Sequence, residues 1–171
     1  ALACPVGIEV KAYVTLIAGG RFKEALEVIR RRNPLPGICG RICTHPCEEV
    51  CNRAKVDTPV AIRDLKRFVS DWELAHPEEA EPEAAERVHE EKIAIVGAGP
   101  AGLTAANDLI RLGYGVTVFE ALPKAGGMMI TGIPPFRLPR DIMSYEIGAI
   151  ETQAADLSEE DLERLRSLGY M

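Results

Sequence analysis

"KIAIVGAGPAGLTAANDLIRLGYGVTVFE", residues 92–120, decides the fold of the second half of the chain. The continuous apolar run at 92–97 predicts a strand, 100–113 predicts a helix, and 114–120 predicts a second strand. This order is that of a βαβ unit, which requires a parallel sheet covered on both faces. Because a doubly wound domain has more than two strands, we expect this unit to be incomplete.

The turn between the first strand and the helix indicates nucleotide binding. Gly97 permits a tight turn, Gly99 lets the backbone approach a pyrophosphate, and Gly102 lets helix and strand pack closely. Glu120, at the end of the second strand, can accept hydrogen bonds from a ribose. A dinucleotide site is therefore expected, and a glycine turn kept only for packing is the alternative. The fingerprint, which does not separate FAD from NAD, reads Gly97-Ala98-Gly99-Pro100-Ala101-Gly102.

A second motif, "CGRICTHPCEEVC" at 39–51, places four of the five cysteines at intervals of four. An odd number of cysteines weakens a closed disulfide framework, and no export signal is visible, so a reducing cytoplasm is expected. Clustered thiols then favour iron–sulfur ligation, while zinc remains open because C-x3-C spacing is allowed. We expect Gly40 and Pro46 to break any helix here and leave a loop that wraps a cluster.

The rest of the first half predicts helices and loops, with no convincing strand. Apolar residues recur with helical spacing in 8–20 and in 21–32. The segment 58–73 has the same spacing, with Thr58 as its expected N-cap and Pro59 at the first helical position. An all-helical domain is therefore expected.

Charge divides the chain further. The segment 76–91 contains seven Glu, one Arg and two prolines, as a solvated acidic linker does. Ser158 and Asp161 predict a capping box for a short amphipathic helix. We therefore predict an α + α/β chain with a helical domain at 1–75, a linker at 76–91, a Rossmann-like unit at 92–150 and a C-terminal helix at 151–171.

Composition argues against two classes of partner. The formal net charge is −6 and no basic stripe stands out, so nucleic acid is not expected. The longest apolar runs are far shorter than the roughly 20 residues that a membrane span needs, so no membrane span is expected.

Several segments together resemble one known module, over about residues 4–150. They are "GRFKEALEVIRRRNPLPGICGRIC", "PCEEVC", "PVAIRDLKRF", "IAIVGAGPAGLTAA" and "GGMMITGIPPFRLPR". The module is shared by the small subunit of NADPH-dependent glutamate synthase and the N-terminal part of dihydropyrimidine dehydrogenase, and large subunits of electron-bifurcating transhydrogenases are similar. The resemblance implies a helical [4Fe–4S] domain, a Rossmann-like FAD domain, and electron flow from NAD(P)H through FAD and the clusters to a partner.

The resemblance also implies binding residues for FAD. Gly97 to Gly102 resemble the pyrophosphate turn and Glu120 the ribose ligand. A loop closing over the flavin is implied at Gly126, Gly127 and Met128, followed by an extended apolar loop and by Arg137, which resembles an arginine that contacts FAD. Since no second G-x-G-x-x-G exists here, NAD(P)H would bind only through residues absent from this chain, and the chain alone is not expected to oxidise it.

On the iron side, the resemblance assigns Cys4, Cys43 and Cys47 to one cluster and Cys51 to another. Where some members have Gln or Glu as a fourth ligand, this chain has Lys66, whose ammonium cannot ligate iron. The spacing from Cys43 to Cys47 is also short, so Cys39 becomes a candidate and the set drawn from Cys4, Cys39, Cys43, Cys47 and Cys51 stays open. His45 is interpreted as a loop histidine hydrogen-bonded to backbone.

The sequence is also compatible with another class of function. In this alternative, the chain is a non-catalytic docking module, zinc-stabilised or not, that a partner chain completes. The basic triplet at 30–32 offers a contact for an acidic partner, although a solvated helix end explains it equally simply.

Overall fold

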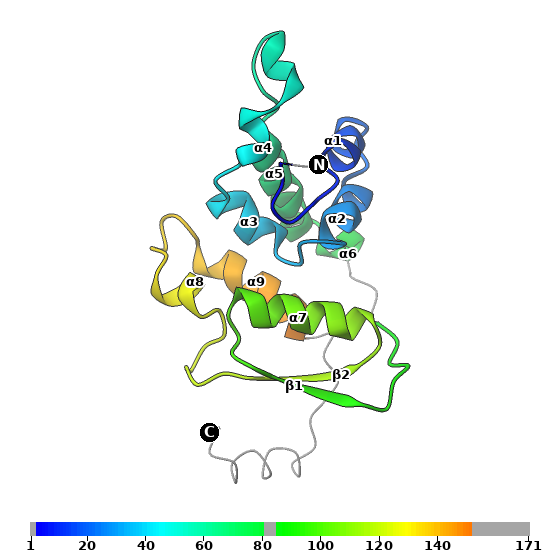
Figure 1. The fold of residues 1–171 in the computed structure, drawn as a ribbon, viewed down its shortest axis with the longest axis vertical. Helices are drawn as coiled ribbons and strands as arrows, with labels where there is room; N and C mark the ends of the chain where they lie inside the picture. Colours follow the sequence, from blue (N-terminus) through cyan, green and yellow to red (C-terminus); the bar gives the residue numbers. More distant parts are fainter. Residues whose placement is uncertain (1–2, 81–84, 152–171) are drawn as a thin grey trace. The chain divides into compact units, whose positions relative to one another are not determined.

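The computed structural model of the chain describes residues 3–80 and 85–151 (Figure 1). The chain divides into two compact units, Ala1–Pro82 and Glu83–Met171. The first is helical and the second is built around two parallel strands, which confirms the predicted α + α/β class. The predicted C-terminal helix, with its capping box at Ser158 and Asp161, lies outside the described residues.

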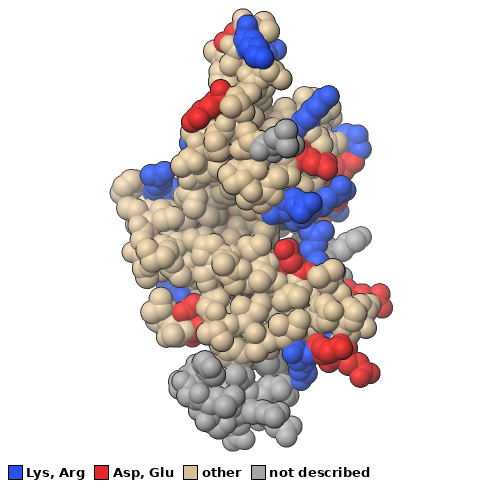
Figure 2. All heavy atoms as spheres, in the orientation of Figure 1, with Lys and Arg blue, Asp and Glu red and all other residues tan. Residues whose placement is uncertain are grey.

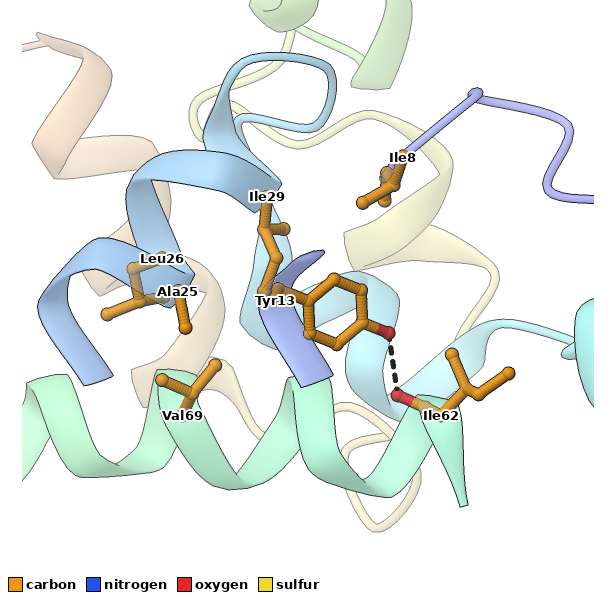
Figure 3. Close-up of a cluster of buried hydrophobic side chains, with 7 residues drawn as sticks. All are labelled: Ile8, Tyr13, Ala25, Leu26, Ile29, Ile62 and Val69. Atoms are coloured by element: carbon orange, nitrogen blue, oxygen red, sulfur yellow. Dashed lines mark hydrogen bonds between the residues drawn. The ribbon is translucent and has the colours of Figure 1, made fainter. Parts of the chain in front are cut away.

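The helical unit follows the predicted order of helices. Its elements are α1 (Val10–Ala18), α2 (Phe22–Arg30), α3 (Pro36–Ile42), α4 (Pro46–Glu49), the 3-10 turn η1 (Asn52–Lys55), α5 (Ile62–Ala75) and α6 (Pro77–Ala80). Their core is a cluster of buried side chains from α1, α2, α5 and the segment before α1, namely Ile8, Tyr13, Ala25, Leu26, Ile29, Ile62 and Val69 (Figure 3). Burial of each larger aliphatic side chain contributes about 1.5–3 kcal/mol.

Two local predictions in this unit are wrong. Helix α5 begins at Ile62 rather than after Thr58, and its N-cap is Ala61, which makes no side-chain capping bond. The Ile62 side chain is buried, and its carbonyl oxygen accepts a hydrogen bond of 3.0 Å from the Tyr13 hydroxyl. Tertiary packing at Ile62 therefore outweighs the local capping preference of Thr58 and Pro59.

The second correction concerns Gly40, which lies inside α3 and does not break it. A Cβ atom at Gly40 would lie 2.8 Å from the Cα of Arg67 on α5, closer than real Cβ contacts. The glycine therefore allows two helix backbones to approach. The helical path ends instead at Cys43–His45, where Cys43 is extended, His45 has a φ of 50° and Pro46 starts α4.

Helix α5 also buries polar side chains. Lys66, Ser70 and Glu73 are only 5%, 2% and 1% exposed. Both guanidinium nitrogens of Arg30 on α2 donate hydrogen bonds to the Glu73 carboxylate, so this buried charge is paired. The face of α5 that contacts α2 and α3 is therefore partly polar.

The second unit confirms the predicted strand–helix–strand order. β1 (Lys92–Val96) and β2 (Gly115–Phe119) pair in parallel, with Lys92 opposite Gly115 and Val96 opposite Phe119. Helix α7 (Pro100–Arg111) connects and covers them. Val116 and Phe119 are buried, whereas Val96 is 71% exposed, so α7 covers the sheet only in part.

The chain after β2 differs from the predicted extended loop. Met128–Thr131 form a short helix, α8, whose N-cap is Gly127 with a φ of 49°. Met129 is buried at 2% exposure, which gives this turn an apolar anchor. Helix α9 (Arg140–Glu151), which the sequence analysis did not anticipate, packs its buried side chains against α7.

Part of the expected linker packs on the second unit. The backbone N–H groups of Val88 and His89 both donate to the carbonyl oxygen of Gly113, at 3.0 Å each. The His89 ring also stacks on Tyr114, with 4.1 Å between centroids. These contacts attach this stretch to the turn before β2, so it is not simply a solvated connector.

The surface carries both signs of charge. Figure 2 shows Lys and Arg interspersed with Asp and Glu on the face that it draws. Within residues 3–80 and 85–151, none of the helices has the length and apolar character to cross a membrane.

Candidate functional site

Four thiols of the helical unit have other thiols as neighbours. Cys39 lies within α3, Cys43 at its C-terminal cap, Cys47 in α4 and Cys4 before α1. Burial raises the pKa of the Cys47 thiol, and the neighbouring Cys4 and Cys43 raise it further. Burial also raises the pKa of Cys39, with Cys43 adding to the rise. Cys43 is thus a neighbour of both Cys39 and Cys47, and these four cysteines, the thiol group, are all free and partly buried.

Cys51 has a different environment. Its pKa is lowered, first by a backbone hydrogen bond from Val60 and then by one from Arg53. None of the main influences on this pKa comes from another thiol. The electrostatic environment of Cys51 thus differs from that of Cys39 and Cys47, and its assignment to another cluster stays a prediction.

Tyr13 lies beside the thiol group. Burial raises its pKa well above the ordinary range, and Cys47, Cys4 and Cys39 add to the rise in that order. The residue is 1% exposed and its hydroxyl donates to the Ile62 carbonyl oxygen (Figure 3). From the sequence, Tyr13 is one of the apolar residues with helical spacing in 8–20, so this neighbour of the thiols was missed.

Lys66 contacts the same group from α5. Its Nζ atom donates a hydrogen bond of 3.0 Å to the Cys39 Sγ, and this ammonium partly offsets the effect of burial on the Cys39 pKa. From the sequence, Lys66 stands where some family members have Gln or Glu, but the sequence does not show where its side chain goes. No local pattern reveals a contact between residues 27 positions apart.

His45 makes contacts typical of a loop histidine. Its Nδ1 lies 3.3 Å from the carbonyl oxygen of Cys43, and its Nε2 lies 3.9 Å from the Glu48 carboxylate. Its backbone N–H donates to the Cys43 Sγ at 3.3 Å. The residue therefore shapes the turn that carries Cys43.

The donors of the thiol group are cysteine sulfurs, which are the ligands that iron–sulfur clusters use. Among the described residues, no three His, Cys, Asp or Glu side chains converge closely enough to hold a single metal ion. A [4Fe–4S] cluster binds each thiolate at a different iron, so its ligands stand farther apart than those of one ion. Cys4 and Cys47 also pack against the apolar core, which excludes water from this side.

The glycine turn of the second unit has the geometry that its pattern predicts. Gly97 has a φ of 98°, and its N–H donates to the Phe119 carbonyl oxygen at 2.6 Å. A Cβ at Gly102 would lie 1.9 Å from the Gly97 carbonyl oxygen, so only glycine fits there. A Cβ at Gly99 would meet nothing within 4 Å. The space beside Gly99 is therefore open, at the N-terminus of α7, where Pro100 and Ala101 are the first helical residues.

Glu120 closes the turn from the end of β2. Its two carboxylate oxygens accept hydrogen bonds from the N–H groups of Ala98, at 2.8 Å, and Leu122, at 2.9 Å. The Leu122 bond and then the Ala98 bond lower the pKa of Glu120. Each oxygen keeps a second lone pair for a hydroxyl donor.

The segment after Glu120 folds back onto the glycine turn. The N–H of Gly126 donates to the Ala98 carbonyl oxygen at 2.8 Å, and a Cβ at Gly127 would lie 3.0 Å from the Gly99 Cα. Met128, the next residue, is 71% exposed. The structure thus brings Gly126 and Gly127, but not an inward-facing Met128, to the glycine turn.

Two arginines of this segment have different roles. The Arg137 side chain is exposed, and its backbone N–H donates a hydrogen bond of 3.0 Å to the Pro134 carbonyl oxygen. Arg140 instead donates to the carbonyl oxygens of Met129, Ile130 and Ile133, at 2.9, 2.7 and 3.0 Å. Arg140 thereby fixes the loop that carries Arg137, a role that the sequence analysis missed.

Comparison with known proteins agrees with both units. Residues 1–78 match the family described as dihydropyrimidine dehydrogenase domain II, 4Fe-4S cluster. Residues 95–150 match the NAD(P)-binding Rossmann-like domain. The resemblance inferred from the sequence is therefore confirmed: a segment that matches a [4Fe–4S] domain family is followed by a segment that matches a Rossmann-like domain.

Curated relatives are subunits of oxidoreductases. The chain is 46% identical over 168 residues to NADP(+)-dependent formate dehydrogenase subunit beta of Moorella thermoacetica, covering 86% of this chain and 24% of the relative. It is 46% identical over 156 residues to NADPH-Fe(3+) oxidoreductase subunit beta of Geobacter sulfurreducens, covering 90% and 23%. With the dihydropyrimidine dehydrogenase subunit PreT of Escherichia coli the identity is 40% over 151 residues, covering 87% and 36%. The chain thus spans about a quarter to a third of these relatives.

Proposed function

We propose that this chain carries the electron-transfer part of an NAD(P)H-dependent flavin and iron–sulfur oxidoreductase, similar to the glutamate synthase small subunit. FAD binds the second unit, a [4Fe–4S] cluster binds the first, and a partner receives the electrons. Residues outside this chain bind NAD(P)H. We place the protein in the cytoplasm, where a reducing environment keeps thiols available for iron.

One observation carries this proposal. Cys4, Cys39, Cys43 and Cys47 lie within residues 1–78, which match a [4Fe–4S] domain family, and the neighbouring thiols among them support a shared cluster. When bound, such a cluster carries one electron at a time, which complements a flavin that accepts two as hydride. The thiols hold the iron, and the apolar core behind Cys4 and Cys47 limits the access of water.

The second unit supplies the means to hold FAD. The open space beside Gly99 and the positive end of α7 suit a pyrophosphate, and the free lone pairs of Glu120 suit ribose hydroxyls. Gly126, Gly127, Met128 and Arg137 follow on the loop that returns to this turn, where the flavin side is proposed.

Anaerobic purification of the full chain tests the proposal. We expect a brown protein with iron and sulfide, and stoichiometric uptake of added FAD. A folded, colourless chain without iron would contradict the cluster. Zinc in place of iron, or no FAD uptake unless a partner chain is added, would favour the docking module instead.

A further inference from the structure

Lys66 is a buried cation whose acceptor is a thiol. The residue is 5% exposed, and its Nζ donates to the Cys39 Sγ at 3.0 Å. Lysine is almost never fully buried unless it is paired. Among the described residues no carboxylate lies within ion-pair distance of Lys66, so the Cys39 sulfur is the acceptor that the structure gives it.

The contact is fixed by helix packing. Gly40 is next to Cys39 on α3, and Arg67 is next to Lys66 on α5. A Cβ atom at Gly40 would lie only 2.8 Å from the Arg67 Cα, so the two helices pack closely at this point. The ion pair of Arg41 with Asp71, at 2.6 Å, joins the same two helices one turn farther along. The packing of α3 against α5 therefore places Lys66 against Cys39.

The chemistry of the pair is incomplete with a neutral thiol. A thiol sulfur is a weak acceptor, whereas a metal-bound thiolate carries negative charge and accepts strong hydrogen bonds from a cation. A buried ammonium without a carboxylate therefore calls for an anionic sulfur. Ligation of Cys39 to iron supplies that anion, since a coordinating thiol is deprotonated.

We propose that Cys39 is a thiolate ligand of the cluster and that Lys66 is a positioning residue that holds this thiolate and raises the cluster's reduction potential. The inference rests on the proposed function. Reduction adds one negative charge, which a fixed ammonium beside a ligand sulfur stabilises. Hydrogen bonds to the sulfurs are among the features that set the potential of such clusters.

The test uses the full chain, purified anaerobically, with iron analysis and an EPR-monitored redox titration. Lys66→Met keeps an unbranched apolar stem but removes the charge. We expect the iron content to stay unchanged and the equilibrium constant for reduction to fall at least tenfold. For a one-electron couple, this corresponds to a reduction potential lower by about 59 mV. Lys23→Met, which removes an exposed lysine of α2, should leave the potential unchanged.

Cys39→Ala tests the ligand itself. We expect Cys39→Ala to lower the amount of bound iron and to change the EPR signal. When Lys66→Met is added to Cys39→Ala, it should no longer produce the shift in reduction potential that it produces in the otherwise wild-type chain. Full iron and a wild-type spectrum in Cys39→Ala would overturn the ligand assignment. In Lys66→Met, an equilibrium constant for reduction within twofold of the wild-type value would overturn the role of Lys66.

A measurement on the unsubstituted chain covers the case in which Lys66→Met does not fold. With ¹⁵N-lysine incorporated, the reduced cluster should show a hyperfine coupling to a lysine nitrogen, and its absence would overturn the contact. The two hypotheses separate cleanly. A chain without iron defeats the proposed function, whereas a chain with iron and no lysine effect defeats only this inference.

Discussion

The two units present their candidate sites through different parts of the chain. In the helical unit the candidate site consists of side chains, the thiols of Cys4, Cys39, Cys43 and Cys47, on and beside packed helices. In the second unit it consists mainly of backbone, exposed because residues such as Gly99 lack a Cβ. Substitutions at helix contacts should therefore disturb the first site. Any side-chain atom added to the glycine turn should disturb the second.

This difference can be measured unit by unit. Trp72 is the single tryptophan of the chain and lies on α5 against Phe22, so its fluorescence reports on the helical unit. Amide hydrogen exchange of β1 reports on the second unit.

Gly102→Ala should have the largest effect. Its Cβ would lie 1.9 Å from the Gly97 carbonyl oxygen, a backbone atom that cannot move aside. We expect a loss of about 3 kcal/mol or more in the second unit, measured by β1 amide exchange, with the Trp72 transition unchanged. Gly148→Ala is the matched control, because its Cβ meets nothing within 4 Å; an equal loss there would contradict the steric explanation.

Gly40→Ala should act on the helical unit alone. The new Cβ would lie 2.8 Å from the Arg67 Cα, so α3 must shift away from α5. We expect about 1–3 kcal/mol lower stability by Trp72 fluorescence during denaturation, and weaker retention of iron. Gly19→Ala, whose Cβ makes ordinary contacts from 3.5 Å, serves as the control. Wild-type stability in Gly40→Ala would show that the helices are not held this closely.

Gly99→Ala separates binding from folding within one turn. Its Cβ would meet nothing within 4 Å, so stability should not change. The same atom would occupy the space proposed for a pyrophosphate, so FAD affinity should fall at least tenfold, about 1.4 kcal/mol. Calorimetric titration measures this, and unchanged affinity would favour a glycine turn kept only for packing.

Tyr13→Phe should have a modest effect. It removes the hydroxyl that donates to the Ile62 carbonyl oxygen and leaves that oxygen without this donor. We expect the helical unit to lose about 1 kcal/mol by the Trp72 transition. Tyr114→Phe, in the second unit, should leave that transition in place.

Glu120 gives the smallest effect, visible as a pH dependence. Hydrogen bonds from Leu122 and Ala98 lower its pKa, so the folded chain favours the carboxylate. This stabilisation is fully present above the unfolded-state pKa of about 4.3 and is lost as pH falls through the lower folded-state pKa. Amide exchange of the second unit should show this loss in the wild-type chain and less of it in Glu120→Gln.

The sequence predicted what depends on neighbouring residues. The apolar run of β1 and the Gly97–Gly102 turn are local signals, and the structure confirms the strands and the helix between them. The burial of Glu73 on α5 could not be predicted this way, because its partner Arg30 lies 43 residues away. Gly40 was misjudged for the same reason, since the need for a glycine there comes from α5.

The site shows the same division. The sequence identified the five cysteines as candidates, but only the fold shows that Cys43 is a neighbour of Cys39 and Cys47 and that Cys4 is a neighbour of Cys47. The contact of Lys66 also depends on the α3–α5 packing. Ligand types can thus be read along a chain, whereas their grouping is decided by tertiary contacts.

The two backbone bonds of Glu120 have a kinetic consequence. They hold the carboxylate in one rotamer as soon as the second unit folds, so no side-chain entropy remains to be lost when a hydroxyl group arrives. At binding sites whose side chains are mobile before binding, immobilising one such side chain costs about 0.5–1.5 kcal/mol. Capture at this turn should therefore proceed by rigid docking, with an association rate limited by encounter rather than by local rearrangement.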